Sequence, residues 1–422
     1  MGIRTGLIGE KLPHSLSPYL HSLLGDPDYS LIELNPDELE RYLLGGTWDA
    51  LNVTIPYKKA VIPYCGALTD RARQIGAANS LVRRADGVIV GDNTDFAGFC
   101  ELVRGIHFAG RKVAILGSGG AGTTVTAASL SLGAREIVVI SRLGNGTTEG
   151  KVTTVGYSDT DRFEDADILV NATPVGMYPD TDKMPIDLSL FGSISADVDL
   201  IYNPLRTRLI LDARRRGIGA RSGLRMLCAQ AVEARRFFGC EPEKDSFALE
   251  RQIIHAKENV VFVGMPGSGK STIARLIAER YKRKYIDTDA LVIKDAGLTI
   301  PDIFAKYGEA RFRELERKAV AEASSQMGAV IATGGGSILD ADNCLALRSN
   351  GFIIWLDCPP KRLATGGRPL SSSPEAIEKM YRERHAIYRE TADVRIAVQP
   401  DNANNIGRII GALEWHYKRG NP

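Results

Sequence analysis

Gly117-Ser-Gly-Gly-Ala-Gly122 and Gly264-Met-Pro-Gly-Ser-Gly-Lys-Ser271 are the two stretches that decide the fold of this 422-residue chain. The first follows the apolar run KVAIL at 112–116, the second follows NVVFV at 259–263, and each precedes a helical pattern. A glycine loop between a strand and a helix lets backbone N–H groups and the helix N-terminus bind a phosphate. The first loop has the G-x-G-x-x-G form of a dinucleotide-binding fold, and the second has the G-x-x-x-x-G-K-[ST] form of a P-loop. Two different nucleotide sites in one polypeptide indicate a fused enzyme with two activities.

The two loops differ in specificity. Glycine makes up 43 of the 422 residues, so the three glycines of the first pattern are expected by chance about 0.4 times in such a chain. The added Lys and Ser make the P-loop a chance event of roughly a few per cent. The P-loop is therefore strong evidence by itself, whereas the first loop needs support from the residues around it.

Composition excludes several classes of protein. Hydrophobic residues make up 44%, charged residues 25%, and the net charge is +2, so neither a nucleic-acid nor a membrane partner is expected. No apolar run approaches the length of a transmembrane helix, and the N-terminus lacks the apolar region of a signal peptide. The six cysteines are scattered without a C-x-x-C pair, which favours reduced thiols. We expect a cytoplasmic enzyme of two to three domains that acts on small molecules.

The pattern of apolar runs predicts an α/β fold throughout. Residues 1–105 alternate short strands (TGLIG and ALNVTI) with helices, one of them at 70–78, and are expected to form a substrate-binding α/β domain. Residues 106–240 are expected to form a Rossmann-type NADP domain, with a helix at 122–132 and strands in EIVVIS, DILVNAT and SISADVDLIY. Its last helix, at 224–240, is expected to pack back on the first domain.

The remainder of the chain predicts a second α/β unit. Residues 241–257 are polar and partly helical, and are interpreted as a linker. Residues 258–422 are expected to form a P-loop domain similar to nucleoside monophosphate kinases. Its strands are predicted in KYIDTD, AVIATGG and GFIIWLD, and helices are predicted after Pro374.

Ordered motifs in the first half carry a family resemblance. His14-Ser-Leu-Ser-Pro18, Asn52-Val-Thr-Ile-Pro-Tyr-Lys58, Gly76-Ala-Ala-Asn79 and Gly91-Asp-Asn-Thr-Asp95 occur in this order. With the glycine loop, Asn171-Ala-Thr173 and the segment 222–230, they resemble shikimate dehydrogenase up to about residue 240.

The chemistry of a ketone reductase fits these motifs. Reduction of a ring ketone needs a proton donor beside the carbonyl, and a Lys held by an Asp can be that donor. The resemblance implies that Lys58 and Asp95 are this pair. It implies further that Ser15 and Ser17 bind the substrate carboxylate, although the two serines could instead cap the helix ahead of Pro18. Ring hydroxyls or the same carboxylate would be held by Thr54, Asn79, Gln230 and Tyr202.

The end of the second Rossmann strand predicts the cofactor. An NAD site usually has Asp or Glu there, but this chain has Ser141-Arg142 and no carboxylate until Glu149. An Arg at this place suits a 2′-phosphate, which favours NADP(H). Residues 143–157 are rich in Gly and Thr, so no helix is expected where the family usually has one. The implied cofactor residues are Gly117, Ser118, Gly119, Gly120, Ala121, Gly122, Ser141, Arg142, Asn171, Thr173 and Gly223.

Residues 258–398 resemble shikimate kinase. The resemblance rests on the P-loop, Asp287-Thr-Asp289, Gly308-Glu-Ala-Arg-Phe-Arg313, Gly334-Gly-Gly336, Arg368-Pro-Leu370, and Arg384 within MYRERHAIY. It implies ATP as phosphate donor. Nucleotide would be bound by Gly267, Ser268, Gly269, Lys270, Ser271 and Thr272, and Mg²⁺ by Ser271 and Asp287.

Phosphoryl transfer requires charge neutralisation and alignment more than covalent chemistry. Lys270 would neutralise the phosphates, with Arg368 closing from a lid. Asp289 would orient the reacting hydroxyl and accept its proton, while Arg313 and Arg384 would bind a carboxylate by forked hydrogen bonds. Gly334, Gly335 and Gly336 would let the backbone approach the ring closely. For the two arginines a helix-face salt bridge is the alternative, and for the glycines a simple turn.

Three functional hypotheses follow. The favoured one is a bifunctional enzyme that reduces 3-dehydroshikimate with NADPH and phosphorylates the resulting shikimate with ATP. The second keeps the folds but has the first half oxidise quinate and the second phosphorylate another small polyol. In the third, one half is a non-catalytic nucleotide-binding module that regulates the other.

Overall fold

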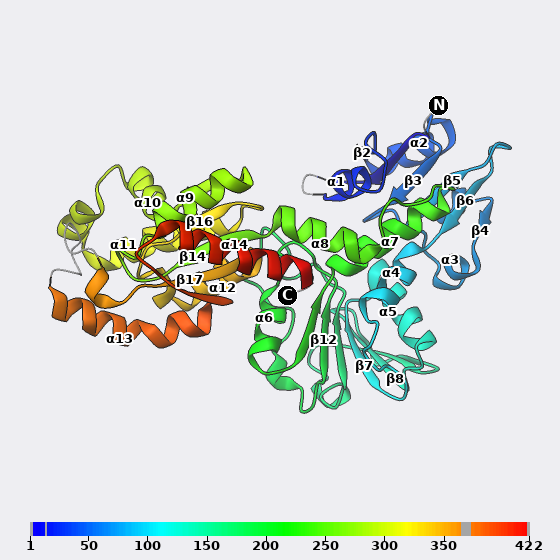
Figure 1. The fold of residues 1–422 in the computed structure, drawn as a ribbon. Helices are drawn as coiled ribbons and strands as arrows, with labels where there is room; N and C mark the ends of the chain where they lie inside the picture. Colours follow the sequence, from blue (N-terminus) through cyan, green and yellow to red (C-terminus); the bar gives the residue numbers. More distant parts are fainter. Residues whose placement is uncertain (1–2, 13–14, 364–372, 420–422) are drawn as a thin grey trace. The chain divides into compact units, whose positions relative to one another are not determined.

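The computed structural model describes residues 3–12, 15–363 and 373–419 and divides into two compact units, residues 1–250 and 251–422 (Figure 1). The first unit holds two sheets and the second holds one, each combined with helices. The predicted α/β class is therefore confirmed. Within the described residues, no helix is both long enough and apolar enough to cross a membrane.

The first sheet is mixed and has six strands in the order β2-β1-β3-β5-β6-β4. β1 pairs in parallel with β2 and β3, whereas β5 is antiparallel to β3 and β6. The strands are β1 Thr5–Gly9, β2 Ser30–Glu33, β3 Ala50–Val53, β4 Ala67–Leu68, β5 Ser80–Arg83 and β6 Ile89–Asp92. The helices are α1 Ser17–Ser22, α2 Leu39–Gly45, α3 Asp70–Ile75 and α4 Thr94–Leu102.

Helix α3 is shorter than the predicted helix at 70–78. Thr69 caps its start by accepting a hydrogen bond from the Ala72 N–H, and Gly76 ends it with a φ of +69°. The left-handed conformation suits glycine because it has no Cβ. The chain therefore leaves the helix three residues early and brings Asn79 to the position just before the start of β5.

The second sheet has seven strands in the order β13-β12-β11-β7-β8-β10-β9. Since β7 lies between β8 and β11, the strand order reverses beside it, and ligands of open α/β sheets bind at such a switch point. The strands are β7 Lys112–Leu116, β8 Glu136–Ile140, β9 Thr148–Glu149, β10 Val152–Val155, β11 Ile168–Asn171, β12 Ala196–Asp199 and β13 Gly219–Ser222. The helices are α5 Gly120–Ser131, α6 Arg208–Arg215, α7 Leu224–Phe237 and α8 Ser246–Lys257.

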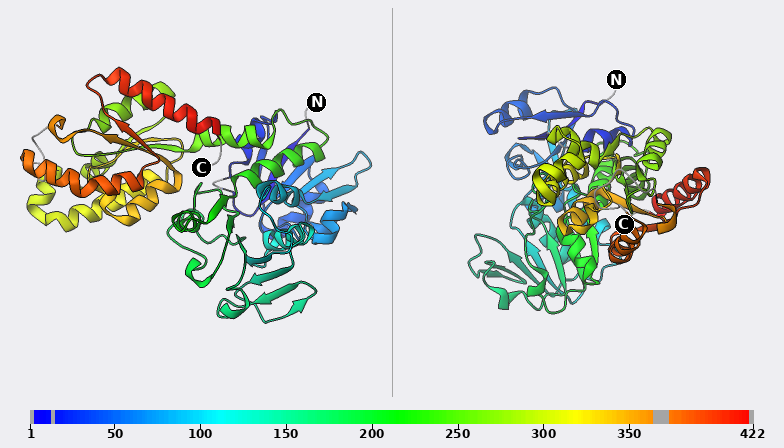
Figure 2. Two further views of the ribbon diagram at one scale, coloured as in Figure 1. Left: turned by 60° about the horizontal axis from the view of Figure 1, so that its bottom comes forward. Right: turned by 90° about the vertical axis from the view of Figure 1, so that its left-hand side faces the viewer.

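Both faces of this sheet are buried. One face packs with α4, α5 and α7 through residues such as Phe99, Val125 and Met226, and the other packs with α6 through Leu209 (Figures 1 and 2). Where the family usually has a helix after Arg142, this chain forms the antiparallel pair β9–β10. The expectation of no helix there is confirmed. The predicted strand SISADVDLIY is shorter, because only Ala196–Asp199 joins the ladder.

Helices α7 and α8 tie the end of the first unit to its core. In α7, the Arg235 guanidinium bonds the buried Asp26 carboxylate at 2.9 Å, which brings the helix onto the first sheet. Residues expected to be a partly helical linker form α8 from Ser246 onward. Glu250 of α8 is buried and pairs with Arg225, whose guanidinium also lies 3.5 Å from the centroid of the Phe247 ring.

The second unit has one parallel sheet in the order β15-β16-β14-β17-β18, and the P-loop follows its central strand β14. The strands are β14 Asn259–Val263, β15 Tyr285–Asp287, β16 Val330–Ala332, β17 Gly351–Asp357 and β18 Val394–Ala397. The helices are α9 Lys270–Tyr281, α10 Thr288–Ala296, α11 Ile300–Ser324, α12 Ala341–Asn350, α13 Pro374–Thr391 and α14 Asn402–Arg419. β18 was not predicted, since only helices were expected after Pro374. It is a short edge strand with a weak apolar pattern.

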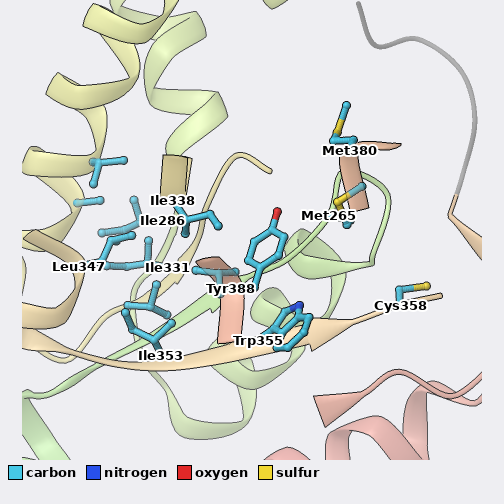
Figure 3. Close-up of a cluster of buried hydrophobic side chains, with 14 of the residues drawn as sticks. Met265, Ile286, Ile331, Ile338, Leu347, Ile353, Trp355, Cys358, Met380 and Tyr388 are labelled. Carbon is cyan, nitrogen blue, oxygen red and sulfur yellow. The ribbon is translucent and has the colours of Figure 1, made fainter. Parts of the chain in front are cut away.

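The core of this unit gathers around Trp355 of β17 (Figure 3). The Tyr388 ring from α13 stacks on the Trp355 indole with centroids 5.7 Å apart, and its hydroxyl lies at the far end of the ring. Met265 of the P-loop and Met380 of α13 belong to the same cluster. The nucleotide loop is therefore supported directly by the hydrophobic core.

The structure predicts how the first unit can be isolated. A fragment of residues 1–257 keeps the Arg225–Glu250 pair and the Phe247 contact, whereas a fragment of 1–243 loses both. Removing the partner of a buried ion costs on the order of 1–3 kcal/mol or more. We expect the longer fragment to show a clearly higher unfolding midpoint in a thermal melt followed by circular dichroism. Equal midpoints would show that α8 does not stabilise this unit.

Candidate active sites

A short ion pair joins the two residues that are predicted to supply the proton in the first unit. Lys58 follows β3, Asp95 lies in the first turn of α4, and the Lys58 Nζ is 2.6 Å from Asp95 Oδ2. Asn93 caps α4 by accepting from the Phe96 N–H, so the helix start is fixed and Asp95 with it. Both side chains are mostly buried, which favours one geometry of this charge-assisted hydrogen bond.

The ion pair lies next to the first glycine loop. A Cβ added at Gly120 would lie 3.8 Å from Cδ of Lys58. The two elements are held together by Asn93, whose Nδ2 donates to Thr124 Oγ1 of α5 at 3.3 Å. The predicted proton donor and the first glycine loop thus lie next to each other.

The other predicted substrate residues lie in segments that follow β1 or β3, or directly precede β5. Asn79 is buried, and its Oδ1 accepts from the Thr94 N–H at 2.7 Å, which orients the start of α4. Thr54 directly follows β3, and its Cγ2 would lie 2.7 Å from a Cβ on Gly9 at the end of β1. Ser15 and Ser17 are half-buried, and Ser15 Oγ accepts from the Ser17 N–H at 3.2 Å. His14 lies outside the described residues.

Gln230 lies in α7 and Tyr202 in the segment after β12, both later in the first unit. Gln230 packs on α4, since its Cβ would lie 3.1 Å from a Cβ on Gly98. Its Nε2 donates to Leu227 O within its own helix. Tyr202 follows β12, and burial raises the pKa of its phenol. No hydrogen bond joins either side chain to Lys58 or Asp95 among the described contacts.

Steric contacts and backbone conformation explain why the first loop needs glycine at two of its positions. A Cβ on Gly122 would lie 2.0 Å from the Gly117 carbonyl oxygen, and Gly117 itself has a φ of +99°. Gly119 precedes the first residue of α5 and has open space around it. Ser118 and Ala121 complete the loop. The helix N-terminus is therefore presented at the carboxyl end of β7, in the geometry that binds a pyrophosphate.

The end of β8 carries Ser141 and Arg142, which are predicted to bind the ribose end of a dinucleotide. Arg142 is exposed, whereas Ser141 is buried and its Oγ has no hydrogen-bond partner among the described residues. The following loop folds against β10, because a Cβ on Gly144 would lie 1.9 Å from Val155 O. The exposed Arg142 guanidinium thus directly follows a residue whose hydroxyl is buried and has no hydrogen-bond partner among the described residues.

Asn171 is predicted to bind cofactor, and the structure buries its side chain completely. Its Oδ1 accepts from the Thr173 N–H at 3.0 Å and Oγ1 at 2.7 Å, and its Nδ2 donates to Asp199. The Asn171 carboxamide is therefore committed within the protein, and Thr173 is the member of the motif at the loop. Gly223 has no room for a side chain, since a Cβ there would lie 1.9 Å from Leu200 O.

A pocket of about 630 Å³ in the second unit collects most of the predicted kinase residues. Those that line it are Gly267, Gly269, Lys270, Ser271, Thr272, Asp289, Arg313, Gly334, Gly335, Gly336 and Arg384. Ser268 is buried beneath the loop, and Arg368 lies outside the described residues. Residues that are distant in sequence therefore share one cavity of the size of a nucleotide and a small substrate.

On the P-loop side, the pocket is lined by Lys270 and by Ser271, whose Oγ is bonded to the Asp287 carboxylate. Lys270 Nζ donates to the carbonyl oxygens of Gly264 and Met265, each at 2.9 Å. Ser271 Oγ donates to Asp287 Oδ2 at 2.8 Å, and Asp287 Oδ1 caps α10 by accepting from the Asp289 N–H. Hydroxyl and carboxylate oxygens are hard ligands that suit Mg²⁺. No group of three His, Cys, Asp or Glu side chains suited to a metal occurs in the part of the chain described.

The opposite side of the pocket is lined by the glycine triplet. A Cβ on Gly334 would lie 2.7 Å from Asp289 Oδ1, and a Cβ on Gly336 would lie 2.6 Å from Arg313 Nη1. Only glycine allows both polar groups to lie against this turn. Asp289 and Arg313 thus face the same small space from α10 and α11.

Arg313 is oriented by a residue that sequence analysis missed. Glu316 is buried, accepts from Arg313 Nη1 at 2.7 Å, and accepts from Ser337 Oγ at 2.7 Å. Burial acts against the charged guanidinium, but Glu316 and Glu309 outweigh it and raise the pKa of Arg313. The i to i+3 spacing on one helix is the signal that could have identified Glu316.

Arg384 is buried and donates to the Gly335 carbonyl oxygen at 2.9 Å. Tyr388, also missed, donates its hydroxyl to the same oxygen at 2.6 Å. A kink in α11 at Gly308, with a φ of +78°, separates the first part of that helix from the part that carries Arg313. Arg313 of α11 and Arg384 of α13 line the pocket from different helices.

Comparison with known proteins follows this division of the chain. A family model described as shikimate dehydrogenase substrate binding domain matches residues 7–81, and one described as shikimate kinase matches residues 266–414. The shikimate dehydrogenase (NADP(+)) of Clostridium beijerinckii is 33% identical over 241 residues, covering 54% of this chain and 89% of that relative. The shikimate kinase of Symbiobacterium thermophilum is 42% identical over 173 residues, covering 38% of this chain and 99% of that relative.

The fold comparison agrees for the first unit. The crystal structure of shikimate 5-dehydrogenase from Thermus thermophilus, in complex with NADP(H) and shikimate, superposes with a TM-score of 0.52 and 29% identity. The match covers 59% of this chain and 97% of that structure.

Proposed function

Because the chain belongs to the shikimate dehydrogenase family in its N-terminal part and to the shikimate kinase family in its C-terminal part, we propose two consecutive reactions for this bifunctional oxidoreductase and kinase. The first unit reduces 3-dehydroshikimate to shikimate with NADPH. The second unit phosphorylates shikimate with ATP to shikimate 3-phosphate. The product of one unit is then the substrate of the other.

The observation that carries the first activity is the Lys58–Asp95 pair beside Gly120. NADPH supplies the hydride when it is bound at the glycine loop. Lys58 Nζ is the donor that protonates the ketone oxygen as the hydroxyl forms, and Asp95 holds Nζ in position through the 2.6 Å bond. Ser15 and Ser17 are proposed to bind the ring carboxylate, with Thr54, Asn79, Gln230 and Tyr202 at the hydroxyls.

NADP(H) rather than NAD(H) is proposed because of the end of β8. Arg142 provides an exposed cation for a 2′-phosphate, whereas the hydroxyl of its neighbour Ser141 is buried. No carboxylate precedes Glu149 in this loop, so nothing there favours a 2′-hydroxyl. The NADP(+) named for the related dehydrogenase agrees with this assignment.

The observation that carries the second activity is the pocket shared by Lys270, Asp289, Arg313 and Arg384. Asp289 would accept the proton of the reacting hydroxyl, and Lys270 would turn to the phosphates as charge develops there. The two arginines would bind the shikimate carboxylate, which leaves the ring against the glycine triplet. Mg²⁺, held by Ser271 and Asp287, would neutralise charge on the phosphates.

The competing hypotheses predict different substrates. Paired hydroxyls at Ser15 and Ser17 and paired cations at Arg313 and Arg384 favour carboxylate substrates over a plain polyol. The Lys58–Asp95 bond and the shared pocket of Lys270 and Asp289 support two catalytic units over a non-catalytic module. Quinate remains the close alternative for the first unit, because it also has a ring carboxylate.

Purified full-length protein tests the proposal with two assays. Shikimate plus NADP⁺ should form NADPH, and shikimate plus ATP and Mg²⁺ should form shikimate 3-phosphate. Quinate should be oxidised more slowly than shikimate at equal concentration. Absence of either product would remove that activity from the proposal, and faster quinate oxidation would favour the alternative.

Lys58→Ala should lower the dehydrogenase kcat by about 10²-fold or more, because the proton donor is lost. Lys59→Ala is the matched control, since Lys59 is the exposed neighbour of Lys58 and should leave kcat near wild type. Initial rates of NADPH formation measure both, with kinase activity as a measure of intact protein. A fully active Lys58→Ala protein would remove Lys58 from the mechanism.

Arg142→Ala should raise the KM for NADP⁺ by about tenfold or more and change the KM for NAD⁺ little, because one charge-assisted hydrogen bond is lost. Arg162→Ala, at another exposed arginine of the same unit, should change neither constant. Wild-type protein that uses NAD⁺ as well as NADP⁺ would contradict the cofactor assignment.

Asp289→Asn should nearly abolish shikimate phosphorylation while ATP binding changes little, since shape is kept and the proton acceptor is removed. Asp295→Asn changes an exposed carboxylate on the same helix that pairs with Lys318, and should be active. With NADPH, ATP and 3-dehydroshikimate supplied together, the Asp289→Asn protein should accumulate shikimate, followed by chromatography over time. Continued formation of shikimate 3-phosphate would contradict this role for Asp289.

A further inference from the structure

A buried carboxylate at the switch point of the second sheet has no role in the chemistry above. Asp199 is the last residue of β12, and in the parallel ladder it pairs with Asn171, the last residue of β11. Asn171 in turn pairs with Leu116, which directly precedes Gly117. Three strand ends therefore lie side by side at the edge where the glycine loop begins.

Asp199 links these strand ends by hydrogen bonds. Its Oδ1 accepts from Asn171 Nδ2 and from the Ile201 N–H, each at 3.0 Å, and its Oδ2 accepts from Thr207 Oγ1 at 2.6 Å. Asn171 extends this network to the next turn, because its Oδ1 accepts from both the N–H and the hydroxyl of Thr173. Two hydrogen bonds in sequence thus connect Asp199 to Thr173.

Thr173 is the end of this chain of contacts and lies against the glycine loop. Its Cγ2 would lie 3.0 Å from a Cβ on Gly117. Its Oγ1 also accepts from the Val175 N–H at 3.2 Å, so the turn after β11 is closed on both sides. The position of this turn therefore sets the space available above the loop.

The three donors to Asp199 are neutral, and the side chain is completely buried. Burial raises the pKa of Asp199 to about 6, and the three hydrogen bonds oppose that rise. At neutral pH the group is mainly ionised and can accept from all three donors at once. A buried charge of this kind is costly, and the three hydrogen bonds offset part of that cost.

We propose that Asp199 is a positioning residue of the cofactor site: through Asn171 it holds the Thr173 turn against the glycine loop and thereby sets the affinity for NADP(H). The inference rests on the proposal that the first unit binds NADP(H). It adds a residue that touches no cofactor atom, and it assigns Asn171 an indirect role.

Asp197 offers a matched comparison. It lies two residues earlier on β12, is equally buried, and neither of its oxygens has a hydrogen-bond partner among the described residues. Asp197 therefore matches Asp199 in side chain and burial, although burial and the nearby Asp199 carboxylate raise the pKa of Asp197 well above its usual range. Only Asp199 is connected to the turn, so the two substitutions separate positioning from general stability.

Substitution by Asn should largely preserve the network. In Asp199→Asn, Oδ1 can still accept from Asn171 and Ile201, and the new Nδ2 can donate to Thr207 Oγ1, because a hydroxyl can also accept. In Asp199→Ala the Asn171 carboxamide loses its anchor. The variants to compare are Asp199→Ala, Asp199→Asn, Asp197→Asn, Thr207→Val and the double variant Asp199→Asn with Thr207→Val, all in the full chain.

The measurement is steady-state kinetics with shikimate and NADP⁺, together with NADP⁺ titration of the free protein and kinase activity of the same samples. Asp199→Ala should raise the KM and the Kd for NADP⁺ about tenfold, with kcat and the KM for shikimate changed less than about threefold. Asp199→Asn and Asp197→Asn should stay within about threefold of wild type. The double variant should raise the KM for NADP⁺ by more than its two single substitutions combined, because the Asn Nδ2 then lacks an acceptor.

Other results would overturn the inference. These are an Asp199→Ala protein with wild-type affinity for NADP⁺, an equal loss in Asp197→Asn, or a loss shared by kcat and both KM values. If Asp199→Ala fails to fold, the test is the double-mutant cycle of Asp199→Asn and Thr207→Val. In that cycle, additive effects of the two substitutions on the KM for NADP⁺ would count against the proposal. Wild-type protein without NADP-dependent shikimate oxidation would refute the proposed function itself, which is a different outcome.

Discussion

A Cβ atom at Gly122 would lie 2.0 Å from the carbonyl oxygen of Gly117, so the first cofactor loop can exist only without one. The clearance lets α5 begin directly at the end of β7 and points its N-terminus at the switch point. The second unit obeys the same constraint, since a Cβ on Gly264 would lie 2.6 Å from Leu356 O. In both units the missing atom shapes the loop that is proposed to bind phosphate, and the side chains proposed for catalysis lie around that loop.

Buried carboxylates then orient the side chains that are proposed to act on the substrates. Asp95 holds Lys58, and Glu316 holds Arg313, each through a bond shorter than 3 Å. Such pairs keep long, flexible cations in one rotamer, which matters more to catalysis than the net stability of the pair. Asp199 would act one step further away, on neutral partners. In both pairs a buried carboxylate is bonded directly to the side chain that is proposed to act on the substrate.

The two proposed sites treat one chemical group differently. The first unit would bind the ring carboxylate with the hydroxyls of Ser15 and Ser17, and the second with the guanidinium groups of Arg313 and Arg384. A site that transfers hydride to a neutral ketone has little negative charge to balance, whereas phosphoryl transfer gathers phosphates and a carboxylate in one pocket. The charge of each site therefore matches the charge of its proposed reactants.

Local sequence determined the glycine loops, the strand that precedes each, the absence of a helix after Arg142, and the ordered motifs that identify both families. These features depend on residue type at short spacing, where sterics and propensity act within a few residues. Only the tertiary structure decided that Asn171 bonds Asp199, that Tyr388 and Arg384 share the Gly335 carbonyl oxygen, and that β18 joins the sheet. Those contacts join segments tens of residues apart, and burial decides which polar groups are committed inside and which remain available to a ligand. Strand order brings such segments together at one edge of a sheet, and no pattern within a single segment carries that information.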